Sequence, residues 1–266
     1  MDRFERNLIN RYLSLRSATI TALTPVNRVE ALIQTLWPIK TEHDLIRLGP
    51  SLDGGYLVPD DLTGITACFS PGVGEECRFE LDCVKRGMRV YMADASVDEP
   101  EGFPDQCKFR KQFIGAYSRE EYISMDQWIS DDLGDQQEDL LLQMDIEGAE
   151  YEVLLALARS SLKRFRIMVI EFHRLERLWN EPYFQLISNV FGKLLETHAC
   201  VHSHPNVCSG IIDHEGVSMP RNIELTFLRR DRFQSEEFVK VLPHALDSVD
   251  YRGKRVVMPG NWFQSS

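Results

Sequence analysis

The sequence lacks the features of a membrane-spanning or exported protein. Its longest apolar runs, such as residues 153–158, are far shorter than the ~20 residues that a membrane-spanning helix needs. The first residues, Met1-Asp-Arg-Phe-Glu-Arg6, carry charges of both signs and contain no apolar segment of an export signal. We therefore expect no stable membrane insertion, and we expect the protein in the cytoplasm.

Cysteine is sparse, with six among 266 residues, and no two cysteines form a CxxC pair or a regular framework. In a chain without an export signal, such cysteines are expected to be reduced thiols that lie mostly in the core. The sequence also contains no internal repeat and no low-complexity segment. These absences exclude a small disulfide-stapled module and a repeat array.

Positive charge is in deficit, because 30 basic residues face 41 acidic ones and the net charge is −11. A surface with this charge repels phosphate backbones and anionic lipids, so we expect no nucleic-acid partner. The hydrophobic share of 43% and the charged share of 27% are ordinary for a globular chain. Composition leaves both a monomer and a homo-oligomer open.

The chain begins with a helical pattern. Apolar residues share one face within residues 4–13 and again within residues 29–36, while Pro25 separates these helices and Pro38 ends the second. We expect residues 1–44 to form an N-terminal helical cap. Residues 45–266 are then one domain with a C-terminal lid or tail.

From residue 65 onward, apolar strands alternate with helices. Strands are predicted at residues 65–69, 89–93, 109–114, 139–144 and 166–172. Helices are predicted at residues 75–86, 125–132, 149–158 and 183–197. This alternation predicts an α/β fold with a mostly parallel sheet and helices on both faces. Residues 199–202, 222–228 and 254–258 are predicted to add antiparallel strands at an edge, or a lid.

Acidic residues follow several of the predicted strands. Ligands of open α/β sheets bind beyond the carboxyl ends of the strands, so these positions are the ones that indicate a site. They hold Gly72 and Gly74, then Asp94, then Asp145 with Glu147, and finally Glu171 with His173. A glycine turn followed by acids at neighbouring strand ends indicates a nucleotide-type pocket.

The glycine turn Gly72-Val-Gly74 is, by itself, also typical of an ordinary tight turn. Asp94 strengthens the nucleotide interpretation, because two ribose hydroxyls can bond its two carboxylate oxygens. A helix cap or a turn would also place an aspartate there. A nicotinamide cofactor is disfavoured, because the G-x-G-x-x-G motif needs glycine at position 77, where Cys77 stands.

The segment Asp145-Ile-Glu-Gly-Ala-Glu150 follows a strongly apolar strand and precedes a helix. It delivers acids and a glycine to the mouth of the sheet. On spacing alone, a functional role for Asp145 and a role as the cap of that helix are equally favoured. His173 likewise fits either a catalytic or a structural histidine.

Several further motifs occur in an order that is typical of one family. They are Asp145-Ile-Glu-Gly-Ala-Glu-Tyr-Glu-Val-Leu154, Arg47-x-Gly49, Asp53-Gly-Gly-Tyr56, Gly72-Val-Gly74, Phe113-Ile-Gly115, Ser124-Met-Asp126, His202-Ser-His-Pro-Asn206, Pro220 and Glu224-Leu-Thr226. Over roughly residues 45–230, the sequence resembles the FkbM-type S-adenosylmethionine-dependent methyltransferases. It departs from the usual first motif of methyltransferases, because Phe69-Ser-Pro71 stands where an acidic residue often precedes the glycines.

The resemblance implies a class I methyltransferase fold, which is Rossmann-like and has a seven-stranded sheet with an antiparallel last strand. It also implies that S-adenosylmethionine lies over Gly72 and Gly74 with its ribose on Asp94. Glu80 is then expected in the pocket wall and Asp126 at the adenine edge. Cofactor contacts are further expected from Asp53, Gly55 and Tyr56.

Members of this family methylate hydroxyl groups, so the resemblance implies an O-methyltransferase with a sugar, glycolipid or natural product as acceptor. An alcohol is a poor nucleophile until a base or a metal stabilises the developing alkoxide. Asp145, Glu171 and His173 are predicted as the catalytic residues, and with His204 they are predicted to hold Mg or Mn. A polar loop at residues 202–206 that only lines the cleft is the alternative to a ligand role for His204. A catalytically silent nucleoside-binding module that acts in a complex is the alternative to the enzyme.

Overall fold

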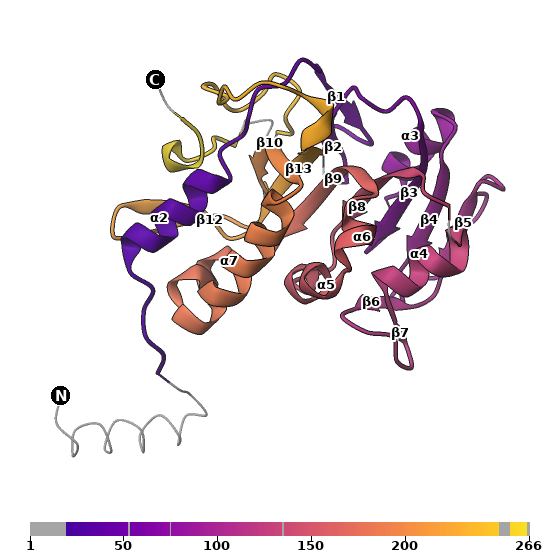
Figure 1. Ribbon diagram of the computed structural model, residues 1–266, viewed down its shortest axis with the longest axis horizontal. Coiled ribbons are helices and arrows are strands. Elements are labelled where there is room, and N and C mark those ends of the chain that lie inside the picture. Colours follow the sequence, from indigo (N-terminus) through magenta and orange to yellow (C-terminus); the bar gives the residue numbers. More distant parts are fainter. Residues whose placement is uncertain (1–19, 53, 75, 135, 250–255, 265–266) are drawn as a thin grey trace.

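A seven-stranded sheet forms the centre of the computed structural model, which describes residues 20–264 except for residues 53, 75, 135 and 250–255 (Figure 1). The strands stand in the order β10-β13-β9-β8-β3-β4-β5. Their bounds are Ile65–Pro71 (β3), Arg89–Ala93 (β4), Cys107–Arg110 (β5), Asp139–Met144 (β8), Phe165–Phe172 (β9), His198–Pro205 (β10) and Ile223–Arg229 (β13). Pairing is parallel from β9 to β5, and β13 runs antiparallel to both β9 and β10. The predicted mostly parallel sheet with a reversed last strand is confirmed.

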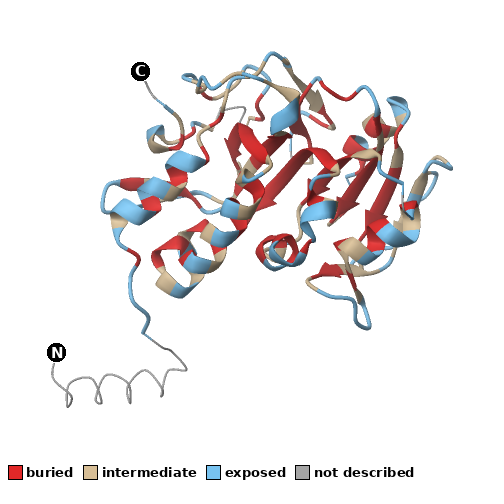
Figure 2. Ribbon diagram, in the orientation of Figure 1, coloured by how far each residue is buried: buried red, intermediate tan, exposed pale blue. Residues whose placement is uncertain are grey.

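Apart from the edge strand β5, the strands of the main sheet are buried on both faces, which is why they read as continuous apolar runs. Successive residues alternate between two cores: Phe69 and Leu142 belong to one, and Cys68 and Leu141 belong to the other. Figure 2 shows the strands buried almost throughout, while the outer faces of the helices are exposed. The sheet is therefore covered on both sides, as the alternating pattern predicts.

The helices divide between the two faces of the sheet. Their bounds are Val26–Thr35 (α2), Arg78–Lys85 (α3), Met125–Leu133 (α4), Glu150–Ala156 (α5), Arg159–Leu162 (α6) and Glu181–Leu195 (α7). Side chains of α2, α4, α5, α6 and α7 enter the first core. The second core is closed by α3 and by the antiparallel pair of β1 (Leu45–Leu48) and β2 (Tyr56–Pro59). No helix in the described part of the chain is long and apolar enough to cross a membrane.

The helix expected after Pro25 is α2, and its residues Val29 and Ile33 are part of the first core. The earlier helix expected within residues 4–13 lies outside the described residues. Because α2 packs against the same core as the sheet, it covers one side of that core. The boundary at residue 44 between a cap and the main domain stays a prediction.

Some elements differ from the sequence-based expectation. The strand expected at residues 109–114 is two strands, because the chain turns at Gln112, whose N–H bonds the carbonyl of Arg110, and leaves the main sheet. The second piece, β6 (Phe113–Gly115), pairs in parallel with β7 (Tyr122–Ser124). An unexpected hairpin is formed by β11 (Ile211–His214) and β12 (Val217–Pro220). Of the strand expected at residues 254–258, residues 256–258 are not extended into a sheet, and the first two lie outside the described residues.

Short 3-10 turns complete the chain. They lie at Leu175–Trp179, Arg230–Arg232 and Gly260–Trp262. Asn180 separates the first of them from α7, and its side chain accepts a hydrogen bond from the N–H of Tyr183. This cap fixes where α7 begins, and the prediction from residue 183 was two residues late.

Candidate active site

A cleft of about 900 Å³ opens at the carboxyl ends of β3, β4 and β8. Predicted site residues that line it are Tyr56, Gly72, Gly74, Glu80, Asp94 and Asp145. Apolar side chains of Phe113, Ile114 and Tyr122 add one wall. The position agrees with the rule that open α/β sheets bind ligands beyond the carboxyl ends of their strands.

The glycine turn after β3 joins three strand ends. Gly72 has a φ of +85°, and a Cβ at this position would lie 1.5 Å from the carbonyl oxygen of Asp145. The N–H of Gly72 donates to the carbonyl of Ala93, and the N–H of Asp145 donates to the carbonyl of Pro71. A Cβ on Gly74 would meet no atom of the described residues within 4 Å. Gly72 thus allows the turn to pack against the end of β8, and Gly74 leaves space at the cleft.

Asp94 follows β4 and lies in a turn. Its Oδ1 accepts hydrogen bonds from the backbone N–H of Ser96 at 2.7 Å and from the hydroxyl of Ser96 at 2.6 Å. No group in the described part of the chain donates to its Oδ2, and no helix begins here. Asp94 is therefore a turn residue and not a helix cap, with one carboxylate oxygen fixed and the other available at the cleft.

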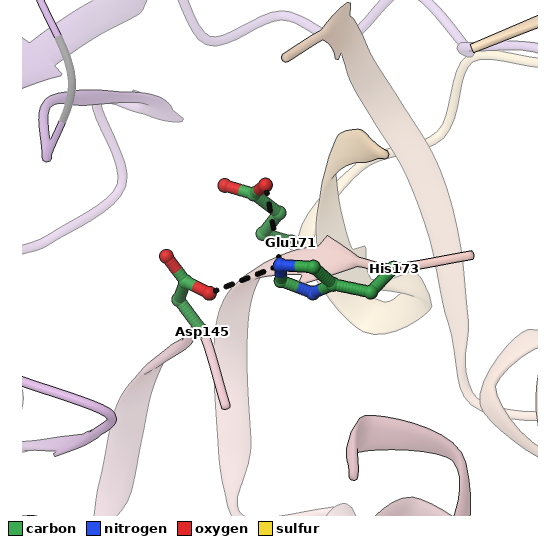
Figure 3. A group of neighbouring side chains, drawn as sticks. All are labelled: Asp145, Glu171 and His173. Carbon is green, nitrogen blue, oxygen red and sulfur yellow. Dashed lines mark ion pairs between the residues drawn. The ribbon is translucent and has the colours of Figure 1, made fainter. Parts of the chain in front are cut away.

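Asp145, Glu171 and His173 converge at the neighbouring ends of β8 and β9 (Figure 3). The Nε2 atom of His173 lies 3.7 Å from Oδ1 of Asp145 and 3.6 Å from Oε1 of Glu171. One potential ligand atom from each of the three residues lies within 4.8 Å of the others. Parallel pairing of the two strands brings together side chains that are 26 residues apart in the sequence.

Glu150 contacts His173 on the side of the imidazole ring that faces away from Asp145 and Glu171. Its Oε1 lies 3.1 Å from Nδ1 of His173 and also accepts hydrogen bonds from the N–H groups of Ile146 and Gly148. Glu150 is fully buried, and Ala149 occupies the N-cap position of α5 without a side-chain bond. The interpretation of Asp145 as the cap of that helix is thus wrong: Glu150 stabilises the turn that precedes α5.

The charges of Glu171 and His173 shift each other's pKa. Burial raises the pKa of Glu171, and the charges of Asp145 and Glu224 raise it further. Burial alone would lower the pKa of His173, but the hydrogen bond to Glu150 and the surrounding carboxylates outweigh burial and raise it. Glu171 also accepts hydrogen bonds from the side-chain amides of Asn206 and Asn222. The site therefore holds one imidazole among several carboxylates.

The histidines of the 202–206 block lie within β10 and are not in a loop at the cleft. The Nε2 atom of His202 lies 2.8 Å from Oδ1 of the buried Asp247. His204 is 2% exposed, and its Nδ1 lies 3.7 Å from Oε2 of Glu224, on the far side of β13 from Glu171. His204 is therefore outside the group of Asp145, Glu171 and His173.

The remaining predicted residues lie elsewhere. Asp53 is outside the described residues. The carbonyl of Gly55 accepts a hydrogen bond from Arg47, and a Cβ on Gly55 would overlap the carbonyl of Pro50, so this glycine serves the packing of the β1–β2 turn. Asp126 accepts a hydrogen bond from the N–H of Ala158 at the start of α6 and is not among the residues that line the cleft.

Sequence reasoning missed the roles of Glu150, Ser70 and Gln143. The hydroxyl of Ser70 lies 2.5 Å from Oε1 of Glu80 and 2.6 Å from Oε1 of Gln143, all of them buried. A polar residue inside an otherwise apolar strand, as at Ser70 and Gln143, is a signal that could have indicated a buried network.

Comparison with known proteins places most of this site in one family. Residues 71–197 match the family model of the methyltransferase FkbM domain. The matched residues, just under half of the chain, resemble the FkbM methyltransferase domain. The match confirms the predicted similarity to the FkbM-type methyltransferases. The FkbM domain includes the glycine turn, Asp94, Asp145, Glu171 and His173, and it ends before β10.

No curated protein matches the chain. Among solved structures, it is similar to a 1,6-didemethyltoxoflavin-N1-methyltransferase of Burkholderia thailandensis with bound 1,6-didemethyltoxoflavin and S-adenosylhomocysteine. The identity is 13% and the TM-score 0.30, over 63% of this chain and 72% of that one. This likeness is too weak to carry a conclusion about the present chain.

Proposed function

We propose that this protein is an S-adenosylmethionine-dependent O-methyltransferase whose acceptor is a hydroxyl of a sugar, a glycolipid or another natural product. The observation that carries the proposal is the position of Asp145, Glu171 and His173 beside the glycine-lined cleft of an FkbM domain. The methyl group of the cofactor and the hydroxyl group of the acceptor would come together at the part of the cleft that Asp145 lines. The proposed reaction needs both a cofactor pocket and a group that removes a proton.

The cleft fits the cofactor in size and in chemistry. Its volume of about 900 Å³ lies within the ~300–1,000 Å³ usual for small-molecule pockets. The free carboxylate oxygen of Asp94 suits the ribose hydroxyls, and the apolar wall at Phe113 and Tyr122 suits the adenine ring. The carboxylate of Asp145 at the same cleft favours a cationic sulfonium.

The chain's own residues would position the acceptor and take its proton. The cofactor supplies an activated methyl on a sulfonium, so placement of the acceptor oxygen in line with it provides much of the rate. Asp145 is the member of its group that lines the cleft, and its side chain is 26% exposed against 3% for Glu171. Asp145 would therefore accept the hydrogen bond of the acceptor hydroxyl, while Glu150 fixes the His173 ring behind it.

We further propose that Asp145, Glu171 and His173 bind Mg²⁺ or Mn²⁺. Carboxylate oxygens with an imidazole are the donor set that such ions accept. Glu147 and Glu150 add further negative charge around the single imidazole, and Glu150 fixes Nδ1 so that Nε2 faces the other two side chains. The ion would stabilise the developing alkoxide. His204, the fourth predicted ligand, faces Glu224 and is not part of this proposal.

Calorimetry with S-adenosylhomocysteine tests the cofactor proposal, and we expect binding of one molecule per chain. Transfer from S-adenosylmethionine labelled in its methyl group to a panel of glycosides, glycolipids and polyketides then tests the activity. Absence of nucleoside binding would overturn the proposal. Binding without transfer to any glycoside, glycolipid or polyketide of the panel would favour the silent nucleoside-binding module.

Titration of Mn²⁺ into chelator-treated protein tests the metal proposal. We expect binding that is lost in Asp145→Asn and kept in Glu152→Gln, since Glu152 is an exposed carboxylate of the same segment. Chelator should abolish transfer, and added Mg²⁺ or Mn²⁺ should restore it. A chelator-treated enzyme with full activity would show that Asp145 and His173 act without a metal.

A further inference from the structure

The cleft contains a buried carboxylate that the steps above do not use. Glu80, on α3, is 3% exposed and lines the cleft, and its Oε1 accepts a hydrogen bond from the hydroxyl of Ser70 at 2.5 Å. Its Oε2 is buried and has no hydrogen-bond partner among the described residues. A buried carboxylate oxygen without a donor is costly, so this atom indicates a missing partner.

The surrounding side chains cannot supply that partner. The single hydroxyl proton of Ser70 lies between Oε1 of Glu80 and Oε1 of Gln143, which is 2.6 Å away. Turning the Gln143 amide would give Ser70 a donor, because amide orientation follows the hydrogen-bond network, but Oε2 of Glu80 would still have none. Burial raises the pKa of Glu80, and a cation in contact with it would restore the charged form.

The cofactor has three arms on its sulfonium, and the proposed function assigns two of them. The ribose arm would extend to Asp94 at the end of β4, and the methyl would point to Asp145 at the end of β8. β3 lies between these two strands, and Ser70 is near its carboxyl end. The third arm ends in an ammonium and a carboxylate. The polar part of the cleft at Ser70 and Glu80 therefore remains for this arm.

Resting on the proposed function, we propose that Glu80 binds the α-ammonium group of the cofactor's methionine arm. Oε2 of Glu80 would accept an N–H of that ammonium, and Ser70 would hold Oε1 and so fix the carboxylate. Residue 70 of β3 is an uncharged serine, so the negative charge at this point of the cleft comes from Glu80 of α3. Glu80 is then a specificity residue for cofactors that keep the amino group.

Two ligands separate this contact from the rest of the cofactor site. S-adenosylhomocysteine carries the ammonium, whereas 5′-methylthioadenosine has only a methyl group on its sulfur in place of the whole arm. By calorimetry, Glu80→Gln should weaken S-adenosylhomocysteine binding about 10- to 100-fold, the range for a hydrogen bond to a charged group. Binding of 5′-methylthioadenosine should stay within about two-fold of wild type, since no arm reaches position 80. The matched control is Glu76→Gln, a carboxylate of the same cleft that already pairs with Arg78, and it should change neither affinity.

Wild-type protein offers an independent measurement, which decides the question if Glu80→Gln does not fold. Deaminated S-adenosylhomocysteine, which keeps the carboxylate but has no amino group, should bind wild type about 10- to 100-fold more weakly than S-adenosylhomocysteine. Equal affinity of the two ligands for wild type, or equal losses of both nucleosides in Glu80→Gln, would overturn the assignment. If wild type binds no nucleoside at all, the proposed function fails first, and the two failures are therefore distinguishable.

Discussion

At the scale of single residues, Asp94 divides its carboxylate between the fold and the cleft. Ser96 bonds Oδ1 twice and so fixes the orientation of the side chain, while Oδ2 has no donor within the described residues. A carboxylate whose orientation is already set loses little entropy when it binds a diol. The contribution of Asp94 to cofactor affinity should therefore be close to the full value of a charged hydrogen bond.

Asp94→Ala should weaken binding of S-adenosylhomocysteine by about 1.5–3 kcal/mol, the usual contribution of hydrogen bonds to charged groups. Its unfolding free energy should change little, because the side chain is only partly buried at the edge of the cleft. Calorimetry and urea unfolding measure the two quantities. Asp105→Ala, an exposed aspartate of the same loop, is the control that should leave both unchanged. Unaltered affinity in Asp94→Ala would remove Asp94 from the cofactor site.

Asp145→Asn should lower the rate of methyl transfer by about 10²- to 10⁴-fold, the range for loss of a positioned acid–base group. Affinity for S-adenosylmethionine should stay within a few-fold, because the lost charge faces the acceptor and not the ribose. Glu152→Gln, on the exposed side of the same segment, should keep normal turnover. Near-normal turnover in Asp145→Asn would contradict the catalytic role of the whole group.

The sequence predicts the site residues that depend on the ends of strands. Asp145, Glu171 and His173 each directly follow or end an apolar run, so their convergence could be expected once a parallel sheet was inferred. Glu150 could not be placed behind His173 this way, because its role depends on a side chain that turns back over the 146–148 turn. The place of His204 depends on its register with Glu224 in β13, which no local pattern contains.

At the scale of elements, the contact between the turn after β3 and the end of β8 sets the shape of the cleft. Gly72→Ala would place a methyl group 1.5 Å from the carbonyl oxygen of Asp145, at a φ of +85°. We expect the unfolding free energy to fall by about 4 kcal/mol or more, because backbone has to move to relieve the overlap. Gly74→Ala in the same turn, where a Cβ meets nothing within 4 Å, should change stability by less than about 1 kcal/mol. Urea unfolding of both variants checks this, and equal stability of the two would contradict the packing of the turn.

The start of β10 contains a histidine that must stay neutral in the fold. His198 is fully buried, its Nε2 bonds the carbonyl of Phe165, and burial lowers its pKa from 6.5 to about 4. Below its usual pKa the unfolded chain binds a proton that the folded chain does not, so stability falls as the pH falls through this window. The loss should be about 1.4 kcal/mol for each pH unit between the two values.

His198→Gln lacks this titration and serves as the reference. Urea unfolding at about pH 7 and about pH 4.5 should show that the stability advantage of wild type over His198→Gln shrinks by roughly 2.5 kcal/mol on acidification. Other groups titrate equally in both proteins and cancel in the difference. A constant advantage would mean that His198 accepts a proton in the folded state as readily as in the unfolded one.

Long apolar runs made most elements predictable, and short or interrupted ones did not. The runs that form β8 and β9 are recognisable because both faces of these strands are buried. The break between β5 and β6 was missed because apolar residues lie on both sides of the polar run 110–112, in which the turn at Gln112 separates the two strands. The hairpin of β11 and β12 is equally hard to predict, because its first strand is largely exposed and has a weak apolar pattern.

At the scale of the whole molecule, the order of strands brings four acidic positions to one edge. β4, β3, β8 and β9 are consecutive neighbours in the sheet, so Asp94, Glu80, Asp145 and Glu171 lie along a single line of strand ends or beside it. Acidic side chains are thus concentrated at a cleft that suits a cationic cofactor and a divalent ion. Strand order is a property of the complete fold, which is why the sequence could single out these acids but could not give the order in which all four lie along the sheet.

A crystal structure with S-adenosylhomocysteine tests the central claim most directly. The account predicts the nucleoside in the cleft of β3, β4 and β8, with its ribose hydroxyls within hydrogen-bond distance of Asp94 and its sulfur on the side of Asp145. A nucleoside bound outside this cleft, or one whose ribose faces away from Asp94, would contradict it.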